Sequence, residues 1–322
     1  MYEQLDGYHA YYAYSDRVSQ YNDLNILVQL ASAAYWKKYF GKIHLVCNLA
    51  HLKTLEKYGV DKIYDSIDTT TLDEMKSFDK RYWSLAKIHL ANKLACIGKP
   101  FTILDTDLWL RGIPALFDLT KDFIGLHREA FDINHSSCAY PEPKDFIGEQ
   151  IALQYDWTTL PINTGLMYFS NFKLVKEWYS FAMWVLERNK FTPHPKSASA
   201  VETIFIEQRA LATLSKDGGY SVGTLIPSTY HTHLIGSDES TLLDGWVPAF
   251  KSSQEMIDCF NKVKHVWGLK SEFGNPLVRK SLIDMLLTEM TADSIDLRKY
   301  ESLLSANIMN NSSEVSSHVS SY

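Results

Sequence analysis

The chain has 322 residues, of which 46% are hydrophobic and 22% charged, and its formal net charge is −6. A chain of this length can bury a large core, either as one extended α/β domain or as two small ones. The negative charge argues against a protein that mainly binds nucleic acid, because no basic stripe is available to neutralise phosphates. The four cysteines are far apart and form no C-x-x-C pair, which argues against a zinc knuckle or a dense disulfide frame.

The start of the chain and its hydropathy predict a soluble, cytoplasmic protein. Residues 1–6 are acidic and polar, whereas a secretory leader is basic and then apolar. No apolar run approaches the length of about 18 residues that a membrane span needs. We therefore expect reduced thiols, no leader and no membrane span.

Strands and helices are predicted to alternate through the first 110 residues. Strands are expected at residues 8–14, 43–47, 62–67 and 101–104, and helices at residues 21–40, 49–58 and 79–98. Gly41, Gly59 and Gly98 stand where these helices would end. Because parallel strands need crossover connections, this order predicts a parallel sheet with helices on its faces.

The pattern is looser after residue 110. Further strands are expected at residues 122–127, 161–170 and 220–225, and further helices at residues 172–188, 200–214, 276–290 and 294–309. Residues 131–159 have no clear period and are predicted to be a long loop or lid over the edge of the sheet. The Ser-rich residues 310–322 are expected to be a disordered tail.

An acidic pair follows the apolar strand predicted at residues 101–104. On an extended backbone, Asp105 and Asp107 would share one face of the strand exit, about 6 to 7 Å apart along the chain. Open α/β sheets bind ligands at this carboxyl edge. Paired carboxylates suit Mg²⁺ or Mn²⁺, which one or two carboxylates and substrate phosphates usually hold. An isolated Asp-x-Asp is more often a loop, and the preceding helix, glycine and buried strand favour a metal site here.

Six short motifs occur in a fixed order between residues 8 and 270. They are the aromatic first strand ending in Ser15-Asp16, a helix with Lys87, Asp105-Thr-Asp107, Asn163-Thr164-Gly165, Glu207-Gln208 and His265-x-x-Gly268-x-Lys270. This order resembles that of the GT-A-fold nucleotide-sugar glycosyltransferases, most nearly the glycogenin-like retaining group.

The resemblance implies a single GT-A-like, Rossmann-type α/β domain over residues 1–270, with a mostly parallel central sheet flanked by helices. Residues 1–110 would form the nucleotide-binding half and residues 111–270 the acceptor half. A C-terminal helical extension over residues 271–309 and the tail would follow.

The resemblance also implies a metal site. Asp105 and Asp107 would hold Mn²⁺ or Mg²⁺ across the diphosphate of a nucleotide sugar, and Asp105 would also lie near the donor ribose or sugar. His265 would complete the metal shell through an imidazole nitrogen, which suits Mn²⁺ better than Mg²⁺. His233 is a competing ligand, since it also begins a His-x-x-Gly, although no lysine follows it.

Donor contacts are implied at both ends of the same region. Lys270 and Gly268 would lie at the phosphates, although the family usually shows His-x-x-Gly-x-x-Lys and this chain has one residue fewer. Lys87 would be a basic group on the donor, with a solvated helix face as the alternative. The end of the first strand would bind the uracil, with core packing as the alternative for its tyrosines. The residues expected there are Tyr12, Tyr14 and Ser15.

The remaining motifs would surround the reacting sugar. Asn163, Thr164 and Gly165 would line the donor-sugar or acceptor side, with the glycine allowing close approach of the backbone. Glu207 and Gln208 would lie near the anomeric carbon, where a carboxylate could stabilise an oxocarbenium-like transition state or orient the acceptor hydroxyl. The alternative for Glu207 is an exposed position on a helix.

These expectations describe a hexosyltransferase that moves a sugar, with retention, from a UDP-sugar to a hydroxyl of a glycan, lipid-linked or protein acceptor. One alternative is a GT-A-like module that binds a sugar nucleotide or glycan without turnover. A nucleotidylyltransferase would need an early Gly-rich, basic loop. This chain has Ser15-Asp16-Arg17 in that place, which argues against nucleotide transfer. A haloacid-dehalogenase-type phosphatase would have Thr or Val at the position of Trp109 and its motif near the start of the chain.

Overall fold

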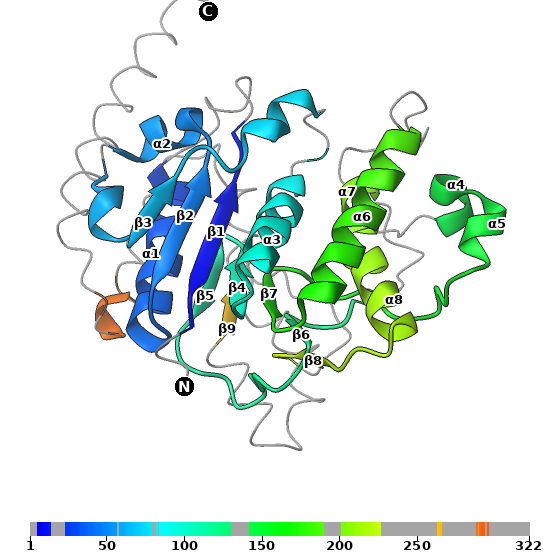
Figure 1. The fold of residues 1–322 in the computed structure, drawn as a ribbon. Helices are drawn as coiled ribbons and strands as arrows, with labels where there is room; N and C mark the ends of the chain where they lie inside the picture. Colours follow the sequence, from blue (N-terminus) through cyan, green and yellow to red (C-terminus); the bar gives the residue numbers. More distant parts are fainter. Residues whose placement is uncertain are drawn as a thin grey trace, which may run out of the picture.

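The computed structural model describes residues 5–13, 23–56, 58–78, 82, 84–129, 142–189, 201–226, 263–265, 288, 290–293 and 295. Within them, a seven-stranded sheet has the order β3-β2-β1-β4-β7-β6-β8, and a two-stranded sheet pairs β5 with β9 (Figure 1). The strands are β1 (Gly7–Tyr11), β2 (Ile43–Cys47), β3 (Ser66–Asp68), β4 (Phe101–Leu104), β5 (Leu108–Leu110), β6 (Phe123–Gly125), β7 (Leu166–Phe169), β8 (Val222–Thr224) and β9 (Val263–His265).

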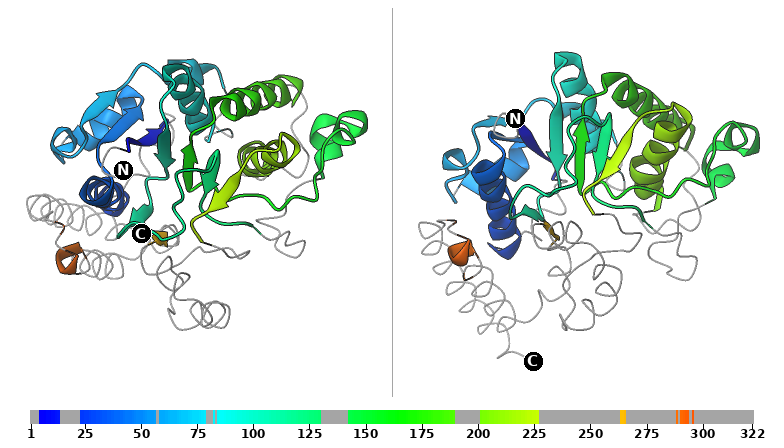
Figure 2. Two further views of the ribbon diagram at one scale, coloured as in Figure 1. Left: turned by 60° about the horizontal axis from the view of Figure 1, so that its bottom comes forward. Right: turned by 90° about the horizontal axis from the view of Figure 1, so that it is seen from below.

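Helices cover both faces of the large sheet. The helices that the structure describes are α1 (Asp23–Tyr39), α2 (Leu49–Glu56), η3 (Val60–Lys62), η4 (Asp73–Ser77), α3 (Leu85–Ile97), α4 (Pro143–Ile147), α5 (Glu149–Ala152), α6 (Phe172–Asn189), α7 (Val201–Ile204), η6 (Phe205–Arg209) and α8 (Ala210–Asp217). Figure 2 shows α1 on one face of the sheet and α3 and α6 on the other.

The large sheet is mostly parallel, as predicted. Strands β3, β2, β1 and β4 are parallel neighbours, β7 runs antiparallel to both β4 and β6, and β8 is parallel to β6. Six of the seven strands therefore point the same way. This confirms the expected α/β fold class, and the arrangement is consistent with a GT-A-like, Rossmann-type domain.

The order of the strands creates a switch point beside β1. From β1 the chain moves outward to β2 and β3, and it then returns to form β4 on the other side of β1. The crossovers on the two sides of β1 therefore diverge. In open α/β sheets, ligands bind in the crevice outside the carboxyl ends of the strands at such a point.

Two apolar clusters, one on each face, hold the sheet between its helices. Side chains alternate along a strand, so Phe101 and Ile103 of β4 pack with α3 and α6, whereas Leu104 packs on the side of α1. All four residues of β4 are buried. This explains why the short run at residues 101–104 is apolar throughout instead of alternating with polar residues.

Three local predictions are wrong. Within residues 131–159, the described part forms the short helices α4 and α5, whose few residues are too short to show a helical period. The strand predicted at residues 62–67 is the 3₁₀ helix η3 followed by β3, because Ile63 and Tyr64 are buried in the core cluster on the α1 face instead of pairing in the sheet. The helix predicted at residues 200–214 is interrupted by the π-helical turn η6 and ends at Asp217.

The chain beyond residue 270 is described at only a few positions. Met290 and Ile295 belong to the same apolar cluster as α1. Asp293 accepts hydrogen bonds from Tyr35 Oη at 2.6 Å and from Arg111 Nε at 2.7 Å. The two predicted terminal helices otherwise lie outside the described residues, as does the whole of residues 310–322. Among the helices that the structure describes, none is both long and apolar enough to cross a bilayer.

Candidate functional site

The acidic pair lies in a turn at the carboxyl end of β4. The backbone N–H of Leu108 donates to the carbonyl of Asp105 at 3.2 Å, which closes a turn over Asp105, Thr106 and Asp107 before β5 begins. The expectation that the two aspartates continue an extended strand is therefore wrong. The chain bends here because β5 leaves the large sheet and pairs with β9.

Asp105 is held by residues 163–165, which lie directly before β7. Its backbone N–H donates to the carbonyl of Gly165 at 2.8 Å, and the N–H of Gly165 donates to Asn163 Oδ1 at 2.8 Å. A Cβ on Gly165 would lie 3.0 Å from Asn163 Oδ1 and 3.2 Å from Leu126 Cδ2. A larger residue at position 165 would therefore crowd the side chains of Asn163 and Leu126.

Lys87 of α3 lies beneath the acidic turn and is only 4% exposed. Its ammonium donates to Asp105 Oδ1 at 2.8 Å and to the Thr164 carbonyl at 3.2 Å, and it forms an ion pair with Glu207. A lysine ammonium has three N–H donors, and three acceptors surround this one. The solvated helix face is thus excluded, and the lysine is directed at protein oxygens.

The two carboxylates control the protonation of Lys87. Burial by itself would lower the pKa of Lys87, but the charges of Asp105 and Glu207 outweigh burial and raise this pKa above its usual value. Lys87 therefore carries a positive charge at neutral pH. It compensates negative charge on the carboxyl groups beside it.

Glu207 is brought into this cluster by the π-helical turn η6, which lies between α7 and α8. Its side chain is 1% exposed, and its Oε1 accepts a hydrogen bond from Thr164 Oγ1 at 2.6 Å. Burial raises the pKa of Glu207, and the nearby Lys87 opposes that rise. An exposed position for Glu207 is excluded. Single π turns occur often at functional sites, where they re-aim side chains.

A second buried polar group lies next to this cluster. Asn163 Nδ2 donates to Glu129 Oε1 at 2.7 Å, and His127 Nε2 lies 3.3 Å from the same oxygen. Glu129 is 1% and His127 0% exposed. Sequence reasoning missed both, although a signal was present: His127 is the last residue of the predicted strand at residues 122–127, Glu129 follows it, and β6 ends at the same edge of the sheet as β4.

Asp107 lies on the β1 side of the site. It is 5% exposed, and its charge acts on His9 of β1. Burial lowers the pKa of His9 to about 3, against the opposing effect of Asp107. The two aspartates thus meet different surroundings: Asp105 faces Lys87, and Asp107 faces the strand on the other side of the switch point.

The structure describes only some of the other predicted site residues. Tyr12 is half-buried just beyond the carboxyl end of β1, and Gln208 is half-buried on η6. The backbone of His265 pairs with that of Leu108, directly after the acidic turn. The remaining predictions lie outside the described residues: Tyr14, Ser15, His233, Gly268 and Lys270.

The donor set at the turn can be compared with what a divalent cation needs. In the part of the chain that the structure describes, no three His, Cys, Asp or Glu side chains are arranged to hold a metal ion. The side chain of Asp105 is 27% exposed, and one of its oxygens is engaged by Lys87. Two carboxylates still fit Mg²⁺ or Mn²⁺ provided that substrate phosphates supply further oxygens.

Comparison with known proteins adds little to this geometry. No model of a known protein family matches the chain, and no curated protein matches it. Solved structures do match, among them mouse xyloside xylosyltransferase 1 in its apo form, with a TM-score of 0.34 and 11% identity over 62% of this chain and 80% of that chain. A likeness at this level carries no argument about activity.

Proposed function

We propose that this protein is a metal-dependent glycosyltransferase that moves a hexose from a nucleoside-diphosphate sugar, a UDP-sugar, to an acceptor hydroxyl with retention. One observation carries the proposal. Asp105 lies at the carboxyl end of β4, beside the switch point at β1, in contact with Lys87 and next to Glu207 and Gly165. This combines the edge at which open α/β sheets bind ligands with the acidic motif of the family that the sequence resembles.

Asp105 and Asp107 are proposed to hold Mn²⁺ or Mg²⁺, with His265 as a third ligand. The pairing of β9 with β5 supports His265 over His233, because it brings the backbone of residue 265 beside Leu108. Opposed residues in an antiparallel pair have Cα atoms about 4.5 to 5.5 Å apart. When bound, the cation would neutralise charge on the departing nucleoside diphosphate.

Lys87 and Glu207 are proposed to position Asp105 instead of touching the donor. Lys87 has an acceptor for each of its three N–H groups, and Glu207 is 1% exposed. Together they fix one oxygen of Asp105 at the acidic turn. Such preorganised charge avoids reorganisation when the leaving group becomes negative.

The substrate groups are proposed to lie around this turn. Tyr12, with Tyr14 and Ser15, would hold the base beyond the end of β1, and Gly268 and Lys270 would lie at the phosphates. Asn163, Thr164 and Gly165 would border the donor sugar, and Gln208 would lie near the anomeric carbon. The acceptor remains a glycan, a lipid-linked sugar or a protein.

A screen of nucleotide sugars, with and without Mn²⁺, tests the proposal. A ligand present at 100 times its dissociation constant stabilises the protein by roughly 2.7 kcal/mol, which a thermal melt resolves. We expect stabilisation by a UDP-sugar that requires Mn²⁺ and is lost in Asp105→Asn and in Asp107→Asn. Asp118→Asn, at an exposed turn on another part of the molecule, serves as the control.

Turnover is then measured as release of UDP in the presence of mixed acceptors. Full activity of Asp107→Asn, or activity in excess chelator, would exclude the metal role. Binding without transfer or hydrolysis would favour the non-catalytic module. The anomeric configuration of the product, assigned by NMR, tests retention.

A further inference from the structure

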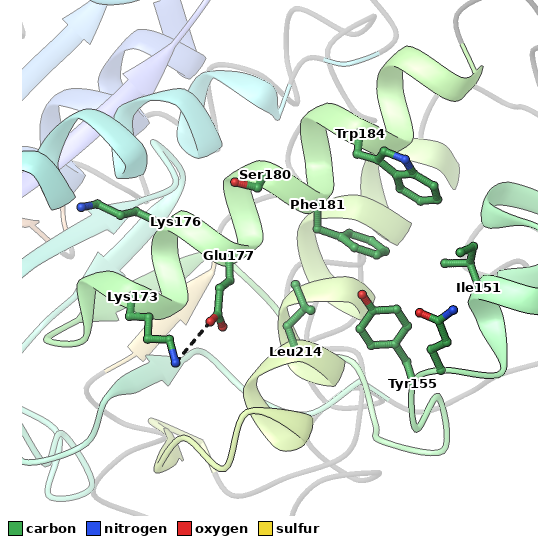
Figure 3. A pocket seen from close by; sticks show the side chains of 10 residues that line it. Ile151, Tyr155, Lys173, Lys176, Glu177, Ser180, Phe181, Trp184 and Leu214 are labelled. Atoms are coloured by element: carbon green, nitrogen blue, oxygen red, sulfur yellow. Dashed lines mark ion pairs between the residues drawn. The ribbon is translucent and has the colours of Figure 1, made fainter.

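A groove separate from the acidic turn lies between α5, α6 and α8 (Figure 3). Its volume is about 640 Å³, which is within the range of small-molecule sites. None of the residues that line it belongs to the cluster around Asp105. The groove is therefore distinct from the acidic turn, and its own side chains determine what could bind in it.

Aromatic rings form one wall of the groove. Tyr155 and Phe181 meet edge to face with centroids 5.7 Å apart, and Phe181 and Trp184 lie 5.9 Å apart. Trp184 is 38% exposed, an unusual fraction for so large an apolar side chain, and Arg188 lies over its ring at 5.8 Å. The exposed part of the Trp184 ring suits ligands with flat, weakly polar faces, such as the C–H faces of pyranose rings.

Polar groups with spare hydrogen-bonding capacity surround this wall. Within the described residues, the side chains of Gln154, Ser180 and Lys176 make no hydrogen bond or ion pair, and the hydroxyl of Tyr155 makes no hydrogen bond. Figure 3 shows the Tyr155 hydroxyl directed into the groove. The same figure shows Ser180 and Lys176 farther along α6, with their polar ends directed away from the rings of Phe181 and Trp184. Polar groups near an apolar wall fix the orientation of a ligand that is long enough to reach both. Sugar hydroxyls can both donate to and accept from such groups.

The spare charge of the groove is positive. Glu177 is already engaged by Lys173 Nζ at 3.6 Å and by the hydroxyl of Tyr220 at 2.8 Å. Lys176 is exposed and keeps its charge uncompensated among the described residues. On a protein with a net charge of −6, this local excess favours an anionic group on the ligand.

We propose that this groove binds a short saccharide that carries carboxylates, of the hexuronate class. One of its rings would stack on Trp184, and a carboxylate would pair with Lys176. The groove would hold the saccharide chain that the enzyme extends. This role rests on the proposed sugar transfer, whereas binding of the saccharide does not depend on it.

The test is direct binding, in chelator and without nucleotide, measured by titration calorimetry. The probes are tetramers of galacturonate, mannuronate and glucuronate and their neutral galactose, mannose and glucose counterparts. We expect at least one acidic tetramer to bind at least tenfold more tightly than its neutral counterpart. Trp184→Ala and Lys176→Glu should each weaken that binding at least tenfold.

Matched controls are available on the far side of the sheet. Lys62→Glu on η3 makes the same charge change at an exposed lysine, and Leu49→Ala on α2 removes an apolar side chain that is 59% exposed. Both controls should bind the tetramer as the unaltered chain does. Circular dichroism and the melting temperature test whether Trp184→Ala is folded. If Trp184→Ala does not fold, Lys176→Glu alone tests the proposal.

Three results would overturn the proposal. They are no saturable binding of any acidic tetramer, equal affinity for acidic and neutral tetramers, and unchanged affinity in Trp184→Ala and Lys176→Glu. Sedimentation with phosphatidylserine vesicles that depends on Trp184, without tetramer binding, would assign the groove to membranes instead. Asp105→Asn should leave tetramer binding intact, so a failure of the nucleotide-sugar proposal is distinguishable from a failure here.

Discussion

At the scale of single residues, Lys87 decides the charge balance of the candidate site. It is the shared partner of Asp105 and Glu207, and it is almost fully buried. Removing one member of a buried ion pair leaves an uncompensated charge, which is more costly than replacing the whole group by apolar side chains. The free energy of unfolding should therefore be very sensitive to this position.

Lys87→Met is expected to lower the free energy of unfolding by about 3 to 5 kcal/mol, because the buried Glu207 and the partly buried Asp105 lose their counter-charge. Urea denaturation of the purified variant measures the loss. Lys93→Met is the matched control: Lys93 lies on the same helix, its side chain is 52% exposed, and it forms only a 3.7 Å surface pair with Glu74, so at most about 1 kcal/mol should be lost.

The double variant Lys87→Met, Glu207→Gln separates charge from packing. Neutralising Glu207 removes one of the two uncompensated charges, so the double variant should be more stable than the sum of the single losses implies. Simple additivity of the two losses would show that packing, and not charge, makes Lys87 important.

At the scale of elements, a chain of hydrogen bonds joins strand and helices inside the core. His9 of β1 contacts Tyr64 Oη at 2.7 Å and Ser32 Oγ of α1 at 3.1 Å, while His51 of α2 contacts Gln29 Oε1 of α1 at 3.2 Å. Burial lowers the pKa of both imidazoles to about 3. The core therefore contains two neutral histidines that must stay neutral for the elements to pack.

This network predicts a loss of stability in acid. The unfolded histidines titrate near 6.5, so between about pH 6.5 and 3 the unfolded state binds more protons than the folded state. Stability is complete above pH 6.5 and falls as the pH decreases, by about 1.4 kcal/mol per pH unit for each histidine. Urea denaturation at several pH values measures this slope.

In His51→Gln, the dependence of stability on pH should be less steep, because about one proton fewer is taken up on unfolding. His44→Gln is the comparison, because His44 is partly exposed and the charges of Asp6 and Asp65 oppose the effect of burial on its pKa. A slope that is equal in His51→Gln and the unaltered chain would show that His51 is not responsible for the acid sensitivity.

At the scale of the whole molecule, a segment near the C-terminus packs against the first helix. Met290 and Ile295 are buried in the α1 cluster, and Asp293 joins Tyr35 of α1 to Arg111 after β5. Tyr35 and Arg111 are far from Asp293 along the chain. The segment therefore belongs to the same cooperative unit as the first half of the sheet.

Truncation after residue 287 is expected to lower the free energy of unfolding by about 3 to 6 kcal/mol, because two buried apolar side chains contribute about 1.5 to 3 kcal/mol each. Truncation after residue 309 removes only the Ser-rich tail and should leave the melting temperature unchanged. Equal melting temperatures for both truncations would contradict the packing of this segment, and Asp293→Ala tests its polar contacts separately.

The fold was predictable where elements are regular and local. The strand at residues 43–47 and the strand at residues 101–104 have the predicted bounds, because a short apolar run between two breakers has few alternatives. Strands β5 and β9 were missed, since each has three residues and is stabilised by a partner about 150 residues away. The π turn at Phe205–Arg209 was missed because its residues keep a helical composition.

The amino-acid sequence by itself determined the α/β class, the parallel direction of the first strands and the acidic motif at the end of β4, since periodicity and crossover rules act over neighbouring residues. Only the tertiary structure decided that Lys87 is buried between Asp105 and Glu207, that Glu129 and His127 join the same edge, and that residue 265 lies beside the turn. Those contacts join segments far apart along the chain, and their geometry follows from sheet order and packing, which local patterns do not encode.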